Sequence, residues 1–110
     1  MKLVIIADDA RVGIDAVNYD DLDMSQLDPS IHAIQWYGEY GEVEFKSKFE
    51  NGQTIKPQNQ IITDVTPYQW AVDAWNAAKV AEEAAIAAAI AAAEAAEAAA
   101  EAAAAKQTAS

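Results

Sequence analysis

The sequence contains no cysteine among its 110 residues. This absence excludes disulfide bonds, zinc sites built from thiolates and cysteine nucleophiles, while it leaves the redox compartment open. Glycine and proline are scarce, at four and three residues, and the only histidine is His32. So short a chain has a marginal core, and without disulfides or a metal such a core is commonly supported by oligomerisation.

Basic residues are also few. Seven Lys and Arg stand against 18 Asp and Glu, which gives a net charge of −11. The segment 1–65 carries 12 acidic and five basic side chains, and the remainder of the chain carries six and two. Because affinity for nucleic acid rests on cationic contacts to phosphate, we expect no direct binding of DNA or RNA.

Hydrophobic runs suited to a membrane or a leader are lacking. The apolar run at the N-terminus is too short for a signal sequence and ends at Asp8, so we expect a strand there. The alanine-rich C-terminal segment is long enough to cross a bilayer, but alanine is only weakly apolar and Glu94, Glu97 and Glu101 would be charged at depth. We therefore expect no membrane partner.

Candidate catalytic and metal-binding residues lack a supporting pattern. Asp20–Asp23 has neither the central Gly nor the terminal Glu of an EF-hand loop, so a solvated, turn-forming loop is expected. His32 lies inside a strand pattern, which favours a surface or edge position over a catalytic base. The chain has no Gly-rich phosphate cradle, and its serines have no local context for nucleophilic chemistry. We predict no enzymatic activity, no cofactor and no metal site.

Residues 1–65 show the pattern of a small antiparallel β head. Short alternating or apolar segments predict strands at Lys2–Ala7, Arg11–Val17, Ile31–Tyr37, Glu42–Phe49 and Gln53–Lys56. The aspartate-rich segment between the second and third of these, residues 18–30, predicts a loop that carries Leu22, Met24 and Leu27 as plugs. Ile61 and Ile62 are expected to be the last apolar residues of the core.

The sequence of the head contains two turn signals. Gly38–Gly41 is typical of a turn, and the strand after it should direct Val43, Phe45 and Phe49 inward. Asn51-Gly52 predicts a type I′ turn, because both central positions of that turn need positive φ.

The period of the sequence changes from 2 to 3.6 at Thr66. Thr66 is expected as the helix N-cap, Pro67 as the first helical residue and Gln69 as the partner that closes a capping box. Val65 and Trp70 occupy the two positions of a hydrophobic staple. We therefore place a boundary between a head at 1–65 and a helix at 66–105, followed by a short polar tail at 106–110.

The helix is dominated by alanine. From Ala81 to Ala105, 18 alanines are interrupted only by five Glu and two Ile. Alanine is the best helix former, so a single long helix is predicted. Six side chains fall at steps of three or four and form one longitudinal stripe: Glu83, Ile86, Ile90, Glu94, Glu97 and Glu101.

Two interpretations of this helix compete. Alanine and glutamate could give a self-stable, soluble spacer. Alternatively, small side chains let helix backbones approach closely in an oligomer or against a partner, with the glutamates facing water. We favour the second interpretation and expect interface residues at Ile86, Ala89, Ile90 and Ala93.

Aromatic residues at the predicted turn give a second candidate interface. Most aromatic side chains of so small a head are expected in its core. Tyr37 and Tyr40 flank the turn itself, so we expect these two in an interface instead.

Residues 1 to about 80 resemble small proteins encoded in tailed-bacteriophage genomes, often near tail-fibre genes. The resemblance rests on Asp15–Asp23, on Ile31–Gly38 with its His-Ala-Ile-Gln-Trp strand, on Gly41–Phe45, and on Ile61–Asp64 before an aromatic helix. It carries no catalytic residues. It implies a virion protein, made in the host cytoplasm, whose partners are tail-fibre, baseplate or capsid proteins.

The function expected from residues and resemblance together is a non-enzymatic virion structural component that forms a homo-oligomer. Two alternatives stay open. A tail-fibre assembly chaperone would share the charge and interface residues but leave the mature particle. An acidic mimic of DNA would use its carboxylates to inhibit a host DNA-binding protein.

Overall fold

The computed structural model describes residues 1–109, and the side chains of residues 1–105. It has the predicted α+β class, with antiparallel strands followed by one long helix. The chain divides into two compact units, Met1–Ala78 and the helical segment that begins at Lys79. The first unit thus continues past the boundary expected at residue 65, because Ala71 and Trp75 of the helix are part of its core.

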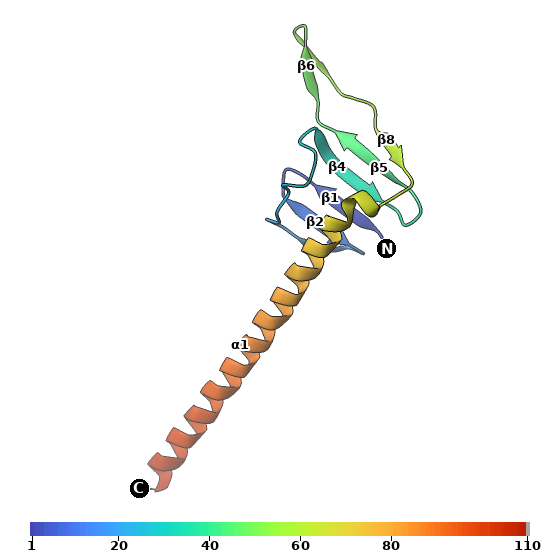
Figure 1. The fold of residues 1–110 in the computed structure, drawn as a ribbon. Helices are drawn as coiled ribbons and strands as arrows, with labels where there is room; N and C mark the ends of the chain where they lie inside the picture. The colour runs from blue at the N-terminus through green and yellow to red at the C-terminus, as the bar shows by residue number, and fades with distance from the viewer. Residues whose placement is uncertain (110) are drawn as a thin grey trace. The chain divides into compact units, whose positions relative to one another are not determined.

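The first unit is built on a six-stranded antiparallel sheet in the order β3-β2-β1-β4-β5-β8 (Figure 1). Its strands, in chain order, are β1 Leu3–Ile6, β2 Arg11–Ile14, β3 Val17–Tyr19, β4 Ile31–Trp36, β5 Gly41–Phe45 and β8 Gln60–Ile62. A separate two-stranded sheet is formed by β6 Lys48–Glu50 and β7 Gln53–Ile55.

The core lies on one face of the large sheet. Register places Val12 opposite Ile5, Ile5 opposite Ile34, and Ile34 opposite Val43, so one row of aliphatic side chains crosses four strands. All four side chains are almost fully buried. Helix α1, Gln69–Ala109, adds Ala71 and Trp75 to the same cluster. Burial of this one apolar layer is the main favourable contribution to the folding of the unit.

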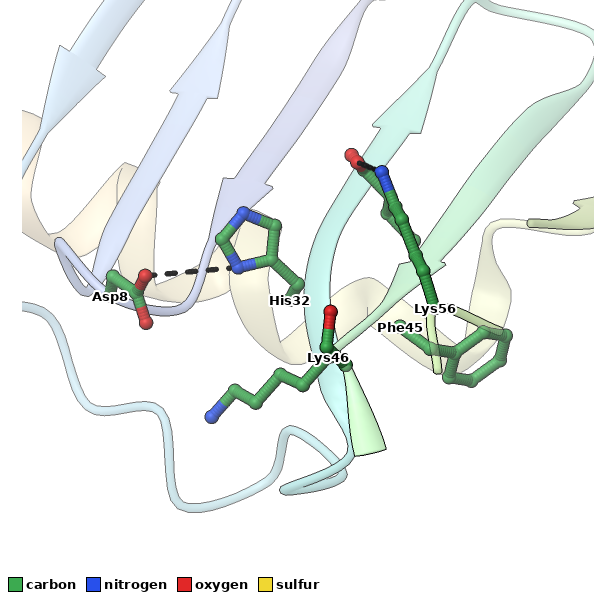
Figure 2. Close-up of a pocket in the computed structure, with 7 residues that line it drawn as sticks. Asp8, His32, Phe45, Lys46 and Lys56 are labelled. Carbon is green, nitrogen blue, oxygen red and sulfur yellow. Dashed lines mark hydrogen bonds and ion pairs between the residues drawn. The ribbon is translucent and has the colours of Figure 1, made fainter. Parts of the chain in front are cut away.

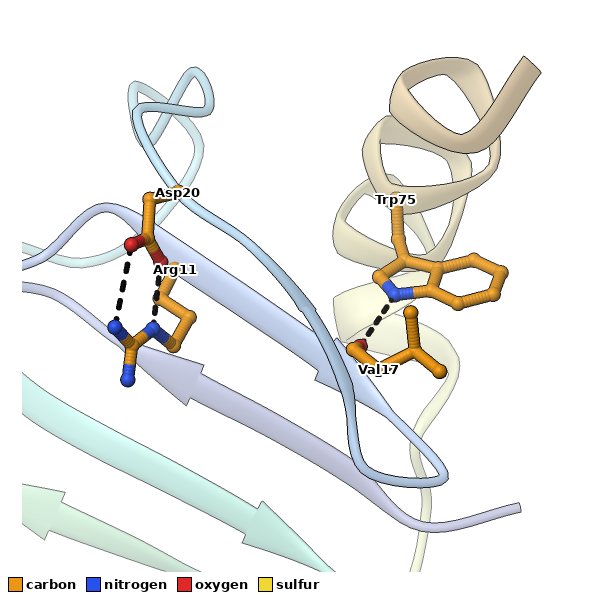
Figure 3. A network of polar contacts seen from close by, with 4 residues as sticks. All are labelled: Arg11, Val17, Asp20 and Trp75. Carbon is orange, nitrogen blue, oxygen red and sulfur yellow. Dashed lines mark hydrogen bonds and ion pairs between the residues drawn. The ribbon is translucent and has the colours of Figure 1, made fainter. Parts of the chain in front are cut away.

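Trp75 holds the start of the helix against the sheet by two specific contacts. Its indole N–H donates a hydrogen bond to the carbonyl oxygen of Val17 over 2.8 Å (Figure 3). Its ring meets the ring of Tyr19 edge-on, with centroids 5.7 Å apart and planes at 69°. Because β3 is an edge strand, the indole docks the first turns of the helix at the margin of the sheet.

The strand predicted over Arg11–Val17 is divided in two. Asp15 and Ala16 both have positive φ, at 48° and 70°, so the chain reverses there and β3 pairs with β2. This corrects the expectation of one continuous strand, and it takes Asn18 and Tyr19 out of the predicted loop. Ala16 does not indicate a turn in the sequence, because positions with positive φ are usually occupied by Gly or Asn.

The acidic loop after β3 plugs the core as predicted. Leu27 is buried, and Leu22 and Met24 pack against the core cluster from partly buried positions. Arg11 holds the start of the loop through two guanidinium contacts to Asp20, at 2.6 and 3.2 Å. These hydrogen bonds lower the pKa of the Asp20 carboxyl and raise the pKa of Arg11.

The strand predicted over Glu42–Phe49 is also interrupted. β5 ends at Phe45, and the N–H of Lys46 donates to the carbonyl of Ser30 over 2.8 Å. The chain then enters the separate β6–β7 hairpin, where Phe49 is 75% exposed. The inward orientation expected for Phe49 is wrong, because strict alternation along the sequence says nothing about where a strand leaves its sheet.

The predictions for the Asn51-Gly52 turn and for Ile62 are confirmed, whereas the prediction for Ile61 is wrong. Asn51 and Gly52 have φ of 50° and 77°, so the predicted two-residue turn with positive φ at both positions is confirmed. Ile62 packs against the core cluster as expected. Ile61 does not, because neighbouring residues of a strand point to opposite faces, and its side chain is exposed.

The helix begins differently from the predicted capping box. A 3₁₀ turn, η1 Thr66–Tyr68, precedes α1, and the residue at its N-cap is Val65, without a side-chain capping bond. The N–H of Thr66 donates instead to the Asp64 carboxylate over 3.0 Å, and the Gln69 amide donates forward to Asp73 over 3.1 Å. Because the 3₁₀ turn already includes Thr66, this residue is not at the N-cap, and its hydroxyl does not serve as the predicted capping acceptor.

The two staple residues, Val65 and Trp70, are partly buried against the core cluster. Helix α1 continues through Ala109, beyond the end expected at Ala105, so the predicted polar tail has helical backbone over 106–109. Ser110 lies outside the described residues.

Candidate interaction surfaces

The first candidate surface is the tyrosine pair at the turn between β4 and β5. Gly38 in this turn has φ of 115°, and a Cβ at Gly41 would lie only 2.4 Å from the carbonyl oxygen of Gln35. Both positions therefore require glycine. The resulting turn brings the rings of Tyr37 and Tyr40 together, with centroids 5.1 Å apart, and leaves these residues 40% and 52% exposed.

Hydrogen bonds hold Tyr37 in place. Its hydroxyl lies 3.0 Å from Gln35 Oε1 and 3.1 Å from Glu42 Oε2, so it can donate its proton to either acceptor. The bond to the Glu42 carboxylate raises the pKa of Tyr37, since loss of the phenolic proton would place two negative charges side by side. A positioned, amphipathic ring at the surface is typical of protein interfaces, because it offers apolar area together with a polar end.

The second candidate surface is the helix after Lys79. Ile86 and Ile90 are 52% and 54% exposed, and Ala89 and Ala93 are exposed too. These four residues follow the i, i+3, i+4, i+7 spacing and therefore share one helix face. The structure thus places the predicted helix residues together, and it places Tyr37 beside Tyr40. The helix group and the tyrosine pair belong to different compact units.

A third surface is missed by the sequence patterns. The segment 46–57, here called the basic arm, contains β6, the Asn51-Gly52 turn and β7, and every residue of both strands is exposed. It carries three lysines and one glutamate, so its net charge is +2 within a chain of −11. One feature of the sequence could have indicated this surface, since three of the chain's seven Lys and Arg residues fall within the segment. Its alternating pattern, however, suggests a half-buried strand.

A polar hollow of about 360 Å³ lies at the foot of the basic arm (Figure 2). Lys46 and Lys56 line it from the arm, and Lys56 Nζ lies 3.4 Å from Glu44 Oε1. On its other side, His32 Nδ1 lies 3.7 Å from Asp8 Oδ2. This distance exceeds that of a hydrogen bond, and both side chains are exposed, so the pair has the geometry of a surface contact rather than of an oriented general base.

Metal ligands do not converge in the part of the chain whose side chains are described. Among residues 1–105, no three His, Cys, Asp or Glu groups lie together in a way that could hold a metal ion. No helix in the described part of the chain is both long and apolar enough to cross a bilayer.

Comparisons with known proteins identify no relative of this chain. Profiles of protein families, curated protein sequences and solved structures all give no match to the chain.

Proposed function

We propose that this protein is a non-enzymatic structural component of a tailed-bacteriophage virion, associated with the tail fibre or the baseplate. In this proposal the β head docks on a virion protein, and the alanine-rich helix packs against copies of this chain or against a partner. The phage assignment rests on the sequence resemblance of residues 1–80. The association rests on the exposed helix face.

One observation carries the proposal: Ile86 and Ile90 are more than half exposed within a surface made mostly of methyl groups. Burial of an isoleucine side chain contributes roughly 1.5–3 kcal/mol. Small neighbouring residues add to this gain, because they allow a partner to approach closely without a rotamer cost. Association that buries Ile86 and Ile90 is therefore favourable relative to the isolated helix, in which both side chains are exposed to water.

Charges on the helix argue against a self-sufficient spacer. Glu94, Glu97 and Glu101 follow one another at helical spacing, so like charges repel along one face. Glu101 also lies toward the C-terminal end, where the helix dipole disfavours negative charge. In an assembly that buries the apolar side chains and leaves these carboxylates in contact with water, the free energy of apolar burial would offset the repulsion between the carboxylates.

Truncation tests the proposal. A chain ended after Lys79 keeps the whole compact unit Met1–Ala78, including Trp75, so we expect it to fold. Its mass by light scattering should fall to that of a monomer, and its incorporation into particles should be lost. The matched control ends after Ala105 and should behave as the full chain does. The same number of chains per particle in light scattering, together with equal incorporation, for both truncations would contradict the proposal.

A tail-fibre chaperone is the first alternative, and it would use the same surfaces. Mass spectrometry of purified particles separates the two functions, because a chaperone would be absent from the particle whereas a structural component is present in fixed copy number.

A DNA mimic is the second alternative. Glu94, Glu97 and Glu101 are all exposed and lie about 4.5 to 6 Å apart along the helix axis. The many alanines between them dilute the charge of a duplex-like surface. Strong, salt-sensitive binding to a host DNA-binding protein would favour this function.

A further inference from the structure

The basic arm has a charge opposite to that of the rest of the molecule. The arm carries +2, whereas the rest of the chain carries four Lys or Arg against 17 Asp or Glu, a net charge of −13. Any second copy of this chain therefore presents an acidic surface to the arm. Charge of this kind steers encounter and fixes register more than it adds affinity.

The arm also presents apolar groups to solvent. Phe49 is 75% exposed and Ile55 is 42% exposed. Phe49 pairs with Thr54 and Ile55 pairs with Lys48 in the hairpin, so the two apolar side chains lie on opposite faces. A two-stranded hairpin is at best marginally stable in water by itself. The arm would therefore gain stability from a covering partner.

One face of the arm combines an apolar group with a cation. Lys48 and Ile55 are directly opposite each other in the β6–β7 register and therefore share that face, with Glu50 and Gln53 as the next pair along it toward the turn. A hollow of about 250 Å³ beside them has Lys46 and Lys48 in its wall together with Phe45 and Pro57. The surface on this side of the arm is thus suited to a ligand that is apolar at one point and anionic at the next.

We propose that the Lys48–Ile55 face of the basic arm docks on the helix stripe of a second copy of this chain, where the helix stripe is the row formed by Glu83, Ile86, Ile90, Glu94, Glu97 and Glu101. The inference rests on the proposed association of the helix and names the segment that covers the isoleucines. Along the stripe two isoleucines are followed by three glutamates, so Ile90 and Glu94 place an apolar group that suits Ile55 next to a carboxylate that suits Lys48.

The two surfaces also match in spacing. Opposed Cβ atoms of an antiparallel pair, such as Lys48 and Ile55, lie about 5 Å apart. Along the stripe, Ile90 and Glu94 are separated by about 6 Å of helix rise. Ile55 can therefore lie against Ile90 while the Lys48 ammonium reaches the Glu94 carboxylate.

The polar hollow at the foot of the arm shows which lysines are already paired (Figure 2). Its lining holds two lysines, Lys46 and Lys56, and two carboxylates, Asp8 and Glu44, and Lys56 is paired with Glu44 of its own copy. Lys46 and Lys48 are therefore the cations of the arm that we assign to an incoming carboxylate.

Crosslinking between two single-cysteine variants tests the contact, since the native chain has no cysteine. We expect Ile55→Cys mixed with Ile90→Cys to form a mixed disulfide in mild oxidant. The matched control pairs Ile55→Cys with Ala88→Cys, which lies about 160° around the helix from Ile90. It should give several-fold less product. Equal yields from the two mixtures, or no product from the first, would overturn the inference.

Charge reversal supplies a second measurement. Lys48→Glu should weaken self-association about threefold, the scale of an exposed ion pair, and Glu94→Lys in the same chain should restore it. Lys2→Glu reverses one charge outside the arm and should not be rescued by Glu94→Lys. Absence of rescue for Lys48→Glu would count against the arm contact.

The two proposals fail in different ways. Failure of the arm contact alone would leave the full-length oligomer intact in light scattering, because the helices would then be held by another surface. Failure of the proposed function would show as the same oligomeric state for the full chain and the chain ended after Lys79.

Discussion

Among single residues, Trp75 joins the helix to the sheet by a hydrogen bond as well as by burial. Trp75→Phe keeps an aromatic ring but removes the donor to the Val17 carbonyl. We expect a loss of about 1 kcal/mol in the free energy of unfolding, plus the effect of the smaller ring. Urea denaturation, followed by the fluorescence of Trp36 and Trp70, measures it.

The control for Trp75→Phe is Tyr40→Phe, which changes an exposed side chain and should leave the urea midpoint unchanged. If both variants had the same midpoint as the unmodified protein, the indole bond would contribute nothing to the docking of the helix.

Four aspartates tie stability to acid pH. The pKa values of Asp20, Asp23, Asp28 and Asp64 are all lowered from 3.8 by hydrogen bonds to their carboxylates. A lowered pKa means that the folded state favours the charged form. The resulting stability is complete above the unfolded pKa and is lost as pH falls through the folded values.

Asp64 offers a test of this linkage. The Thr66 hydroxyl and backbone N–H lower its pKa. Asp64→Asn keeps an oxygen that can accept from the backbone but removes the titrating carboxylate, so the melting temperature of this variant should fall less between about pH 4 and pH 2 than that of the unmodified protein. Identical slopes for the variant and the unmodified protein would contradict the role given to Asp64.

Among the elements, the basic arm is separable from the large sheet. Every residue of its two strands is exposed, and its ion pair to the sheet, between Lys56 and Glu44, is a surface pair worth little. Replacing residues 47–56 by a short Gly-Ser link should therefore shift the melting temperature of the head by only a few degrees. Differential scanning calorimetry checks this expectation. A large loss would show that the arm stabilises the sheet, and would make it a poor candidate for a docking element.

Strand ends were the features most poorly predicted from sequence. β2 stops before a turn that contains Ala16 where Gly or Asn would be expected, and β5 stops where Lys46 bonds to Ser30. Neither event has a local signature, because the first depends on pairing with β3 and the second on a residue far back in the chain. Asn51-Gly52 was predictable, since its φ values follow from the two residues themselves.

For the molecule as a whole, the net charge of −11 opposes the compact state by self-repulsion. Raising NaCl from about 10 to 150 mM shortens the screening length from about 30 to 8 Å. The chain ended after Lys79 keeps 13 acidic and six basic residues, a net charge of −7, so its melting temperature should rise over this range. A melting temperature independent of salt would contradict this self-repulsion.

Docking of the basic arm on the helix stripe should weaken over the same range of salt, because it joins opposite charges.

Composition and short-range periodicity were enough to establish the α+β class, the long helix and the exposure of Tyr37, Tyr40, Ile86 and Ile90, because these properties depend on neighbours within a few residues. Long-range pairing settled other features. It turned Phe49 to solvent and carried the basic arm away from the large sheet. Such outcomes depend on which distant segments meet and on where the single apolar layer ends, and a local pattern contains neither.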